Sequence, residues 1–199
     1  MTVMAAGKLS PTELSRIGDL LRDAADEFAN HSYNDFSCRA TAENKVIFIA
    51  IARWQAGQPS GDPDPTWIEN IERVQTGNGK IVSFDNWAMG YFAQRCGALA
   101  KGTASEPALS PAELGMIAAV LDLMAEFREI ELKDRNVTVD YTLSAADENK
   151  QFIAAVIRHE GCDGWQDRVA EAMQSDTEIA VPEHWVMRYF SDRCRELTA

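Results

Sequence analysis

The chain has 199 residues, of which 46% are hydrophobic and 25% charged, and these values are typical of a globular protein with a buried core. Its formal net charge of −12 argues against nucleic-acid binding, because contact with a phosphate backbone needs a surplus of Lys and Arg. The sequence has no run of about 18 apolar residues and no long apolar segment near its start, so we expect neither a membrane span nor a signal peptide.

The first predicted helix begins in the segment LSPTEL at residues 9–14. Ser10 suits the N-cap position, Pro11 the first helical position, and Glu13 the position that completes a capping box. The same device returns in the segment LSPAEL at residues 109–114. Two capping boxes one hundred residues apart indicate that a helical unit occurs twice in the chain.

A second shared block reads DFSCRATAENK at residues 35–45 and DYTLSAADENK at residues 140–150. Thr41 and Ser144 are the predicted N-caps of the helices that follow. The connection before the second block is longer and reads REIELKDRNVTV, residues 128–139. We expect this connection to be a loop and the place where the two halves differ most.

The apolar run VIFIAIARW could form a strand by its β-branched residues, but the Asp-Glu-Asn-Lys lead of its counterpart QFIAAVIRHE favours a helix in both halves. The short segments KIVSF and EIAVP are read as extended connections in which a brief strand is possible. A third helix is predicted before each of them from matching residues at helical spacing: Trp67, Ile71 and Val74 in the first half, and Trp165, Val169 and Ala172 in the second.

The last shared stretch is FDNWAMGYFAQRCGAL at residues 84–99 and PEHWVMRYFSDRCREL at residues 182–197. Seven of its sixteen positions are identical without a gap, namely Trp, Met, Tyr, Phe, Arg, Cys and Leu. Their helical spacing predicts a helix that packs its aromatic residues into a core in each half. Trp87 and Trp185 are expected to lie in related surroundings.

These patterns predict an all-α protein formed by tandem duplication of a four-helix unit. The first repeat is expected to span residues 1–104 and the second residues 105–199, with the two packed closely. Pseudo-twofold symmetry is the expected arrangement, because related surfaces can pack on each other as they do in a dimer.

Cysteine usage indicates a reducing compartment. The chain has four cysteines, and Cys96 and Cys194 occupy equivalent places beside aromatic residues in the two repeats. Equivalent positions in separate cores rarely meet, so free buried thiols are expected and the cytoplasm is the predicted location.

His159, Cys162 and His184 are the candidates for metal ligands, because His and Cys with two residues between them occur in zinc sites. Cys194 could complete such a set. Against this, the position four residues after His159 holds an acidic residue where zinc proteases have a second His, and Gly161 is expected to end the helix. The first repeat has Trp54 at the position that matches His159. We therefore expect no metal and no cofactor.

Polar residues also recur at matching positions. A Glu, an Arg and an Asp brought together could perform acid/base chemistry, or they could form buried ion pairs that tie loops to helices. We favour the structural interpretation, because a duplicated scaffold keeps its packing contacts more readily than two active sites. The shared pairs are Asp35 and Asp140, Glu43 and Glu148, Asn44 and Asn149, Lys45 and Lys150, Arg53 and Arg158, and Arg95 and Arg193.

The negative charge is held mainly by the second half. Residues 1–105 contain ten basic and twelve acidic residues, a net charge of −2, whereas residues 106–199 contain nine and nineteen, a net charge of −10. Solubility alone can explain such a charge. It also suits a surface that captures a basic protein, with attraction at a distance speeding the encounter.

No catalytic nucleophile motif or nucleotide-binding fingerprint occurs in the sequence. The leading hypothesis is therefore a non-catalytic cytoplasmic interaction protein of bacterial type, for example an immunity or inhibitor protein for a basic partner, present as a monomer or a homodimer. The alternative is an enzyme, or a protein that binds a metal or small ligand, with its site between the two repeats. A third hypothesis is an acidic mimic of DNA, with carboxylates spaced like phosphates.

Overall fold

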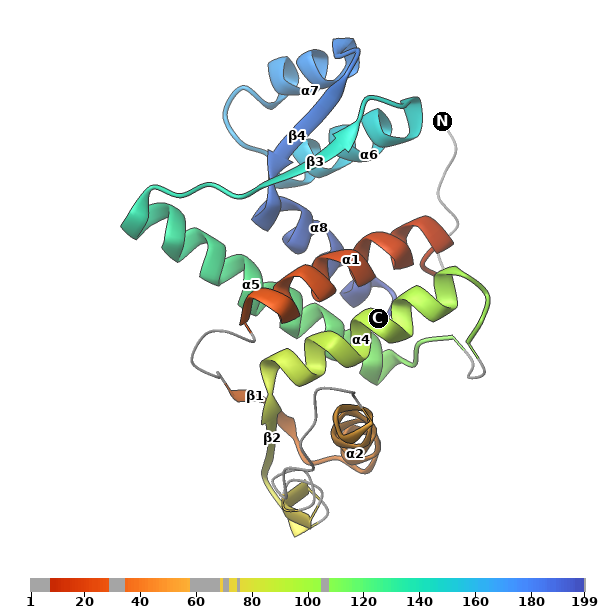
Figure 1. The fold of residues 1–199 in the computed structure, drawn as a ribbon. Coiled ribbons are helices and arrows are strands. Elements are labelled where there is room, and N and C mark those ends of the chain that lie inside the picture. The colour runs from red at the N-terminus through yellow and green to blue at the C-terminus, as the bar shows by residue number, and fades with distance from the viewer. Residues whose placement is uncertain are drawn as a thin grey trace. The chain divides into compact units, whose positions relative to one another are not determined.

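The computed structural model describes residues 8–28, 35–57, 69, 72–74, 76–104 and 108–198. This part of the chain is mainly helical, and its strands form two small antiparallel sheets of two strands each (Figure 1). The predicted helical character is thus confirmed, and the two sheets are additional to it. Among the described residues no helix is both long enough and apolar enough to span a membrane. The duplication and its pseudo-twofold symmetry stay predictions.

The chain divides into two compact units, which are described separately. Unit 1 consists of residues 1–120 with residues 197–199, and unit 2 of residues 121–196. The division falls within helix α5 (Pro111–Arg135), which runs from one unit into the other. The predicted boundary between residues 104 and 105 stays a prediction.

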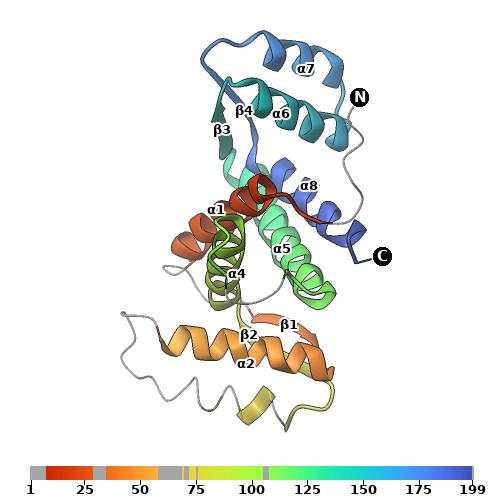
Figure 2. The same cartoon turned by 90° about the vertical axis from the view of Figure 1, so that its right-hand side faces the viewer.

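In unit 1, helices α1 and α4 lie side by side in both views (Figures 1 and 2), and they make the most extensive contact between elements of this unit. Strands β1 and β2 pair antiparallel, with Asp35 opposite Phe84. The elements are α1 (Pro11–Phe28), β1 (Asp35–Arg39), α2 (Ala42–Ala56), β2 (Lys80–Phe84), α4 (Asp85–Ala100) and the first part of α5. The predicted third helix of this half lies largely outside the described residues, Trp67 and Ile71 included.

Unit 2 consists of the second part of α5 and the elements that follow it to the end of α8. Strands β3 and β4 pair antiparallel, with Asp140 opposite Pro182, so both sheets pair equivalent residues of the two shared segments. Helices α6 and α7 lie side by side (Figure 2). The elements are β3 (Asp140–Ser144), α6 (Asp147–Glu160), α7 (Trp165–Gln174), β4 (Glu178–Pro182) and α8 (Glu183–Glu196).

Both predicted capping boxes are present with the same geometry. The Ser10 backbone N donates to Glu13 Oε2 over 2.7 Å, and the Glu13 N donates to Ser10 Oγ over 3.2 Å. Ser110 and Glu113 make the same two bonds over the same two distances. Each box satisfies two backbone N–H groups that a helix start leaves without an intrahelical partner, which fixes where α1 and α5 begin.

The prediction of a loop at residues 128–139 is wrong, because α5 continues to Arg135. The segment is rich in strong helix formers. It also places opposite charges one turn apart, with 4.0 Å between Glu131 and Arg135 and 4.0 Å between Glu129 and Lys133. The helix ends where Asn136 adopts a positive φ of 54°, a conformation that Asn tolerates at a helix end.

One of the two predicted N-caps is correct. Thr41 caps α2, since its side chain accepts a hydrogen bond from the Asn44 N. Ser144 does not cap α6, whose N-cap is Ala146 and has no side-chain cap bond. Ser144 instead ends β3, because the strand pairing with β4 continues through it.

The aromatic helices α4 and α8 are buried as predicted. Trp87 and Trp185 each expose 9% of their surface, and Phe92 and Phe190 expose none. Met89 and Met187, and Cys96 and Cys194, are buried as well, whereas Leu99 and Leu197 at the end of the stretch are partly exposed. All four cysteines are free, as expected from the equivalent placement of two of them.

Gly18 marks the closest approach of α1 to α4, and this site yields a stability prediction. A Cβ atom added at Gly18 would lie 3.1 Å from the Ala93 carbonyl oxygen and 3.4 Å from the Gly97 N, whereas one added at Gly115 meets nothing within 4 Å. We expect Gly18→Leu to lower the free energy of unfolding by about 1–3 kcal/mol through overpacking. Gly115→Leu is the matched control and should raise it by about 0.5–1 kcal/mol through helix propensity. Urea denaturation measures both, and equal effects of the two substitutions would contradict the close packing of α1 on α4.

Candidate functional site

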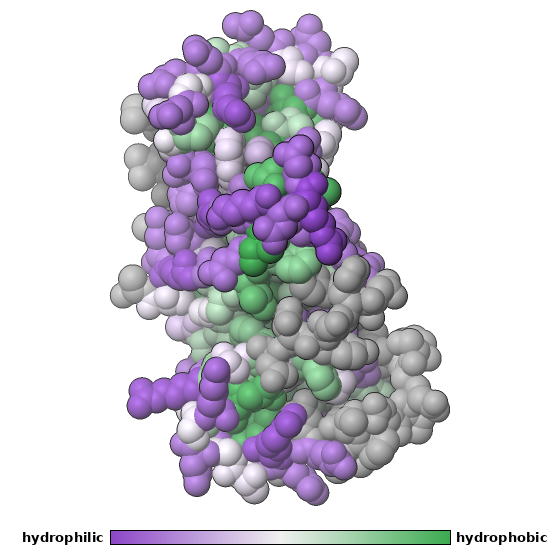
Figure 3. All heavy atoms as spheres, turned by 90° about the vertical axis from the view of Figure 1, so that its left-hand side faces the viewer, coloured by the Kyte–Doolittle hydropathy of each residue, from purple (hydrophilic) through white to green (hydrophobic). Residues whose placement is uncertain are grey.

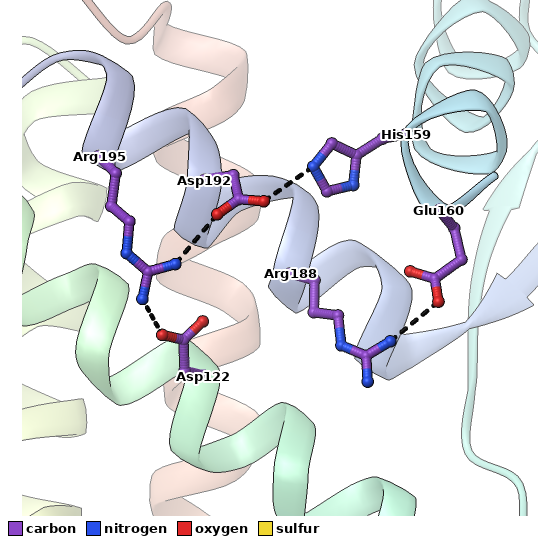
Figure 4. A network of polar contacts seen from close by, with 6 residues as sticks. All are labelled: Asp122, His159, Glu160, Arg188, Asp192 and Arg195. Carbon is purple, nitrogen blue, oxygen red and sulfur yellow. Dashed lines mark hydrogen bonds and ion pairs between the residues drawn. The ribbon is translucent and has the colours of Figure 1, made fainter.

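A network of charged side chains connects the second part of α5, α6 and α8 within unit 2 (Figure 4). Arg195 on α8 bonds Asp122 on α5, and its Nη1 lies 3.0 Å from Asp192 Oδ1. The hydrogen bond that Arg195 donates to Asp122, together with the one that it donates to Asp192, raises the pKa of Arg195. Asp192 Oδ2 in turn lies 3.1 Å from His159 Nε2, so the network reaches α6.

A second arginine of α8 makes the same kind of connection. Arg188 bonds Glu129 on α5, and its Nη1 lies 2.9 Å from Glu160 Oε1 on α6. Burial raises the pKa of Glu160, and the nearby His159 opposes that rise. Arg188 therefore has carboxylate partners on two other helices, whereas Arg195 has one on α5 and one on its own helix. Such contacts between helices hold them in register.

The hollow beside this network has a volume of about 370 Å³, and its described lining lacks a hydroxyl, thiol or amine nucleophile. Its described lining is made of carboxylates, arginines, Ala125 and His159, with no Ser, Thr, Cys or Lys among them. An imidazole beside a carboxylate activates a hydroxyl or thiol in acyl transfer, and here the described lining offers none to activate. Covalent catalysis by the His159–Asp192 pair therefore has no support.

The corresponding positions of unit 1 indicate why His159 and Asp192 lie in contact. Trp54 and Gln94 match His159 and Asp192 in the shared stretches, and the Trp54 indole N–H donates to Gln94 Oε1. The same two positions thus touch in both units, once as a neutral pair and once as an ionisable one. Because the contact between these two positions is also made by the neutral pair of unit 1, it serves to join two helices and does not depend on acid/base chemistry.

A third position changes together with that pair. Gly90 in unit 1 corresponds to Arg188 in unit 2, and a Cβ added at Gly90 would collide with the ring of Trp54. The smaller His159 replaces the indole in unit 2, where the matching position carries a long side chain. These differences are therefore packing adjustments around one helix contact.

The three candidate metal ligands do not form a metal site. His159 contacts Asp192, Cys162 lies in the turn after α6, and His184 is buried with its ring 6.2 Å from that of Trp185. Burial lowers the pKa of His184. Gly161 ends α6 with a positive φ of 65°, as predicted, so the residues on either side of it leave the helix face. Within the described ranges no group of three or more His, Cys, Asp and Glu side chains could hold a metal ion.

The shared asparagines have the same structural role in both units. The side-chain amide of Asn44 donates to the Arg39 carbonyl, and that of Asn149 donates to the Ser144 carbonyl, each over 2.9 Å. Each bond ties the start of a helix to the end of the preceding strand. This agrees with the structural interpretation of that shared pair.

The shared arginines both form ion pairs. The Arg95 Nε lies 3.1 Å from Glu113 Oε1, and both of these side chains are about nine-tenths buried. Arg193 lies 3.3 Å from Glu196. A buried ion pair of this kind fixes the packing of α4 on the start of α5. Cys38, which lies within the shared block at residues 35–45, is a poor nucleophile, because burial raises the pKa of its thiol to about 11.

A different hollow of unit 2, between α7 and β4, has a volume of about 730 Å³. We call it the α7–β4 groove. Its floor is apolar, with Ile157, Ala172 and Ile179, and its rim carries Glu171 and Glu178. Helix α7 has no buried residue, so it covers its neighbours only partly.

Five exposed carboxylates lie on α7, in its flanking turns and at the start of β4, and we call them the α7 acidic face. Among the residues that the structure describes, none of the five has an ion-pair or hydrogen-bonding partner for its carboxylate, in contrast to the carboxylates of the charged network. The cation of the same segment, Arg168, lies over the Trp185 ring at 5.3 Å from its centroid. The five are Asp163, Asp167, Glu171, Asp176 and Glu178.

Sequence reasoning did not single out these five residues. The signal was present, because residues 163–178 contain five acidic residues and one basic residue. What the sequence does not tell is which carboxylates of unit 2 have arginine partners, since those partners come from other helices. Figure 3 shows one face of the chain, on which hydrophilic side chains surround smaller hydrophobic patches.

No protein-family model, curated protein or solved structure matches the chain. The function is therefore argued from the residues of this protein alone.

Proposed function

We propose that the protein is a non-catalytic interaction module whose α7 acidic face binds a basic segment of another protein. The observation that carries the proposal is that five exposed carboxylates gather on one helix and its neighbouring residues without cationic partners in the described part of the chain, whereas Asp122, Glu160 and Asp192 of the charged network are matched by arginines. Like charges held close together repel one another, and a cationic partner relieves that repulsion.

The proposal includes a tandem duplication of a four-helix unit, and the comparison of the halves strengthens the case for function. Where unit 2 has Glu171 and Glu178, the matching positions of the first half hold Arg73 and Lys80. The same architecture is therefore compatible with the opposite charge at these places. The acidic face is then a property of the second repeat and not a requirement of the fold.

A basic protein is the partner that this charge selects. Lysine and arginine side chains would pair with exposed carboxylates, and long-range attraction would raise the association rate. An immunity or inhibitor protein that masks a basic toxin or nuclease fits this chemistry. The four free cysteines support a reducing compartment such as the cytoplasm.

Salt dependence tests this proposal. The probe peptide is a short fluorescein-labelled peptide of alternating lysine and threonine, and its anisotropy is followed as the protein is added. We expect binding that weakens steeply between low and physiological ionic strength, and no binding of the same peptide with glutamate in place of lysine. Equal binding of the two peptides would contradict an electrostatic site. Reversing the charge of Asp167, Glu171 and Glu178 within the α7 acidic face locates the site.

A further inference from the structure

Strand β4 presents one edge of its backbone to the α7–β4 groove. In an antiparallel pair, opposite residues alternate between those that exchange hydrogen bonds and those whose N–H and C=O point away from the partner. The Ala145 N donates to the Thr177 carbonyl, and the Glu183 N donates to the Val139 carbonyl, each over 2.9 Å. These bonds assign the odd-numbered residues of β4 to the bonded side. Ala180, in the middle of the strand, therefore directs its N–H and C=O away from β3.

The groove lies along this outward edge. Four consecutive residues of β4, residues 178–181, line it together with the C-terminal half of α7. Alternate side chains of a strand point to opposite faces, so consecutive residues can line one hollow only along the backbone edge. The hollow thus gives access to the hydrogen-bonding groups of β4 and not merely to one of its faces.

At the two ends of that edge, a backbone group is either already hydrogen-bonded or missing. At one end, the Ser175 hydroxyl donates to the Glu178 carbonyl over 2.7 Å. At the other end stands Pro182, which has no N–H to donate. Between them, the outward N–H and C=O of Ala180 have no hydrogen-bonding partner among the described residues, and its small side chain is exposed. The open edge therefore suits a short guest strand that pairs one of its residues with Ala180.

We propose that a short extended segment of a basic partner protein adds to β4 as an antiparallel strand within the α7–β4 groove, an inference that rests on the proposed function. Backbone hydrogen bonds to Ala180 provide the docking, and strand addition to an open sheet edge is a common mode of peptide recognition. The rim carboxylates of Glu171 and Glu178 select lysine or arginine at the guest positions that face them. Arg168 also lines the groove, with its guanidinium over the Trp185 ring, so the groove presents two carboxylates against one cation.

The experiment compares the probe peptide with a copy whose peptide bonds are N-methylated throughout. The copy keeps every charge and loses every backbone donor, so we expect it to bind at least about tenfold more weakly to the unmodified protein, the loss expected for a hydrogen bond of about 1.4 kcal/mol. Equal binding of the two peptides overturns strand addition. If the α7 acidic face is still needed for both peptides, the proposed function stands, and if it is needed for neither, the proposed function falls as well.

A matched pair of protein variants tests the same edge of β4 by changing the protein and not the peptide. Ala180→Pro removes the outward N–H without touching a bond to β3, and Thr142→Pro does the same on the opposite edge of the sheet, because Thr142 pairs with Ala180. We expect Ala180→Pro to weaken probe binding at least about tenfold and Thr142→Pro to leave it unchanged. Equal effects of the two overturn the proposal. Circular dichroism checks the fold, and if Ala180→Pro unfolds the protein, the N-methylated peptide alone decides.

A second copy of the chain is another occupant that these variants recognise, because it could add through the same edge. Dimers in sedimentation that Ala180→Pro converts to monomers would overturn the assignment to a basic partner.

Discussion

Replacing Asp167, Glu171 and Glu178 together by lysine is expected to weaken binding of the probe peptide by about 10- to 100-fold. An exposed ion pair contributes about 0.2–1 kcal/mol, and a reversed charge replaces attraction by repulsion, so three reversals amount to about 1.4–3 kcal/mol. Anisotropy titrations at low ionic strength measure the change. The expected loss shrinks as salt is added, because salt screens exposed charges.

The matched control reverses three exposed carboxylates of unit 2 that lie outside the α7 acidic face, namely Glu126, Asp134 and Glu148. It changes the net charge by the same amount, and Glu148 lies in the first turn of α6 as Asp167 does in α7. We expect this variant to bind the probe peptide within about threefold of the unmodified protein. Equal losses in the two triple variants would show that net charge alone drives binding, and the α7 acidic face would then have no special role.

Phe190→Ala is expected to lower the free energy of unfolding by about 3–5 kcal/mol. Phe190 is fully buried in α8, and its ring stacks on that of Phe152 with centroids 5.4 Å apart. Truncation removes the buried apolar surface and leaves a cavity that its packed neighbours fill only in part. Urea denaturation followed by circular dichroism gives the change in midpoint at constant slope.

Two further variants serve as a matching change and a control for Phe190→Ala. Phe92→Ala, the matching change in α4, should cost a similar amount, because Phe92 is equally buried. Met173→Ala on the partly exposed α7, where Met173 exposes 38% of its surface, should change stability by less than about 0.5 kcal/mol. A loss below about 1 kcal/mol at either Phe would contradict the view that this aromatic helix anchors the core of its unit.

Local signals allowed most helices to be predicted. The capping boxes of α1 and α5 depend on residues three positions apart, and the period of the aromatic stretches defined α4 and α8. The pairing of β1 with β2 joins segments about forty residues apart in sequence, and no local pattern encodes such a partner. The helical continuation at residues 128–135 was missed because alignment with the shorter first half made it look like an insertion.

The candidate site was only partly predictable, for a physical reason. The acidity of the second half is visible in the composition, but a carboxylate matters for binding only where no cation of the same protein lies beside it. Arg188 and Arg195 lie beside carboxylates on α5 and α6 that are remote in sequence. The groove itself arises where α7 meets the open edge of β4, and neither segment indicates it alone.

The most direct test is to titrate the unlabelled probe peptide into nitrogen-15-labelled protein and follow the backbone amide signals by NMR. The account predicts that the signals of Glu171, Glu178 and Ala180 shift progressively, with the Ala180 amide proton moving downfield as it gains a hydrogen bond. Those of Glu126 and Asp134 should stay in place. Shifts spread evenly over all exposed carboxylates, or an Ala180 signal that does not move while the peptide binds, would contradict it.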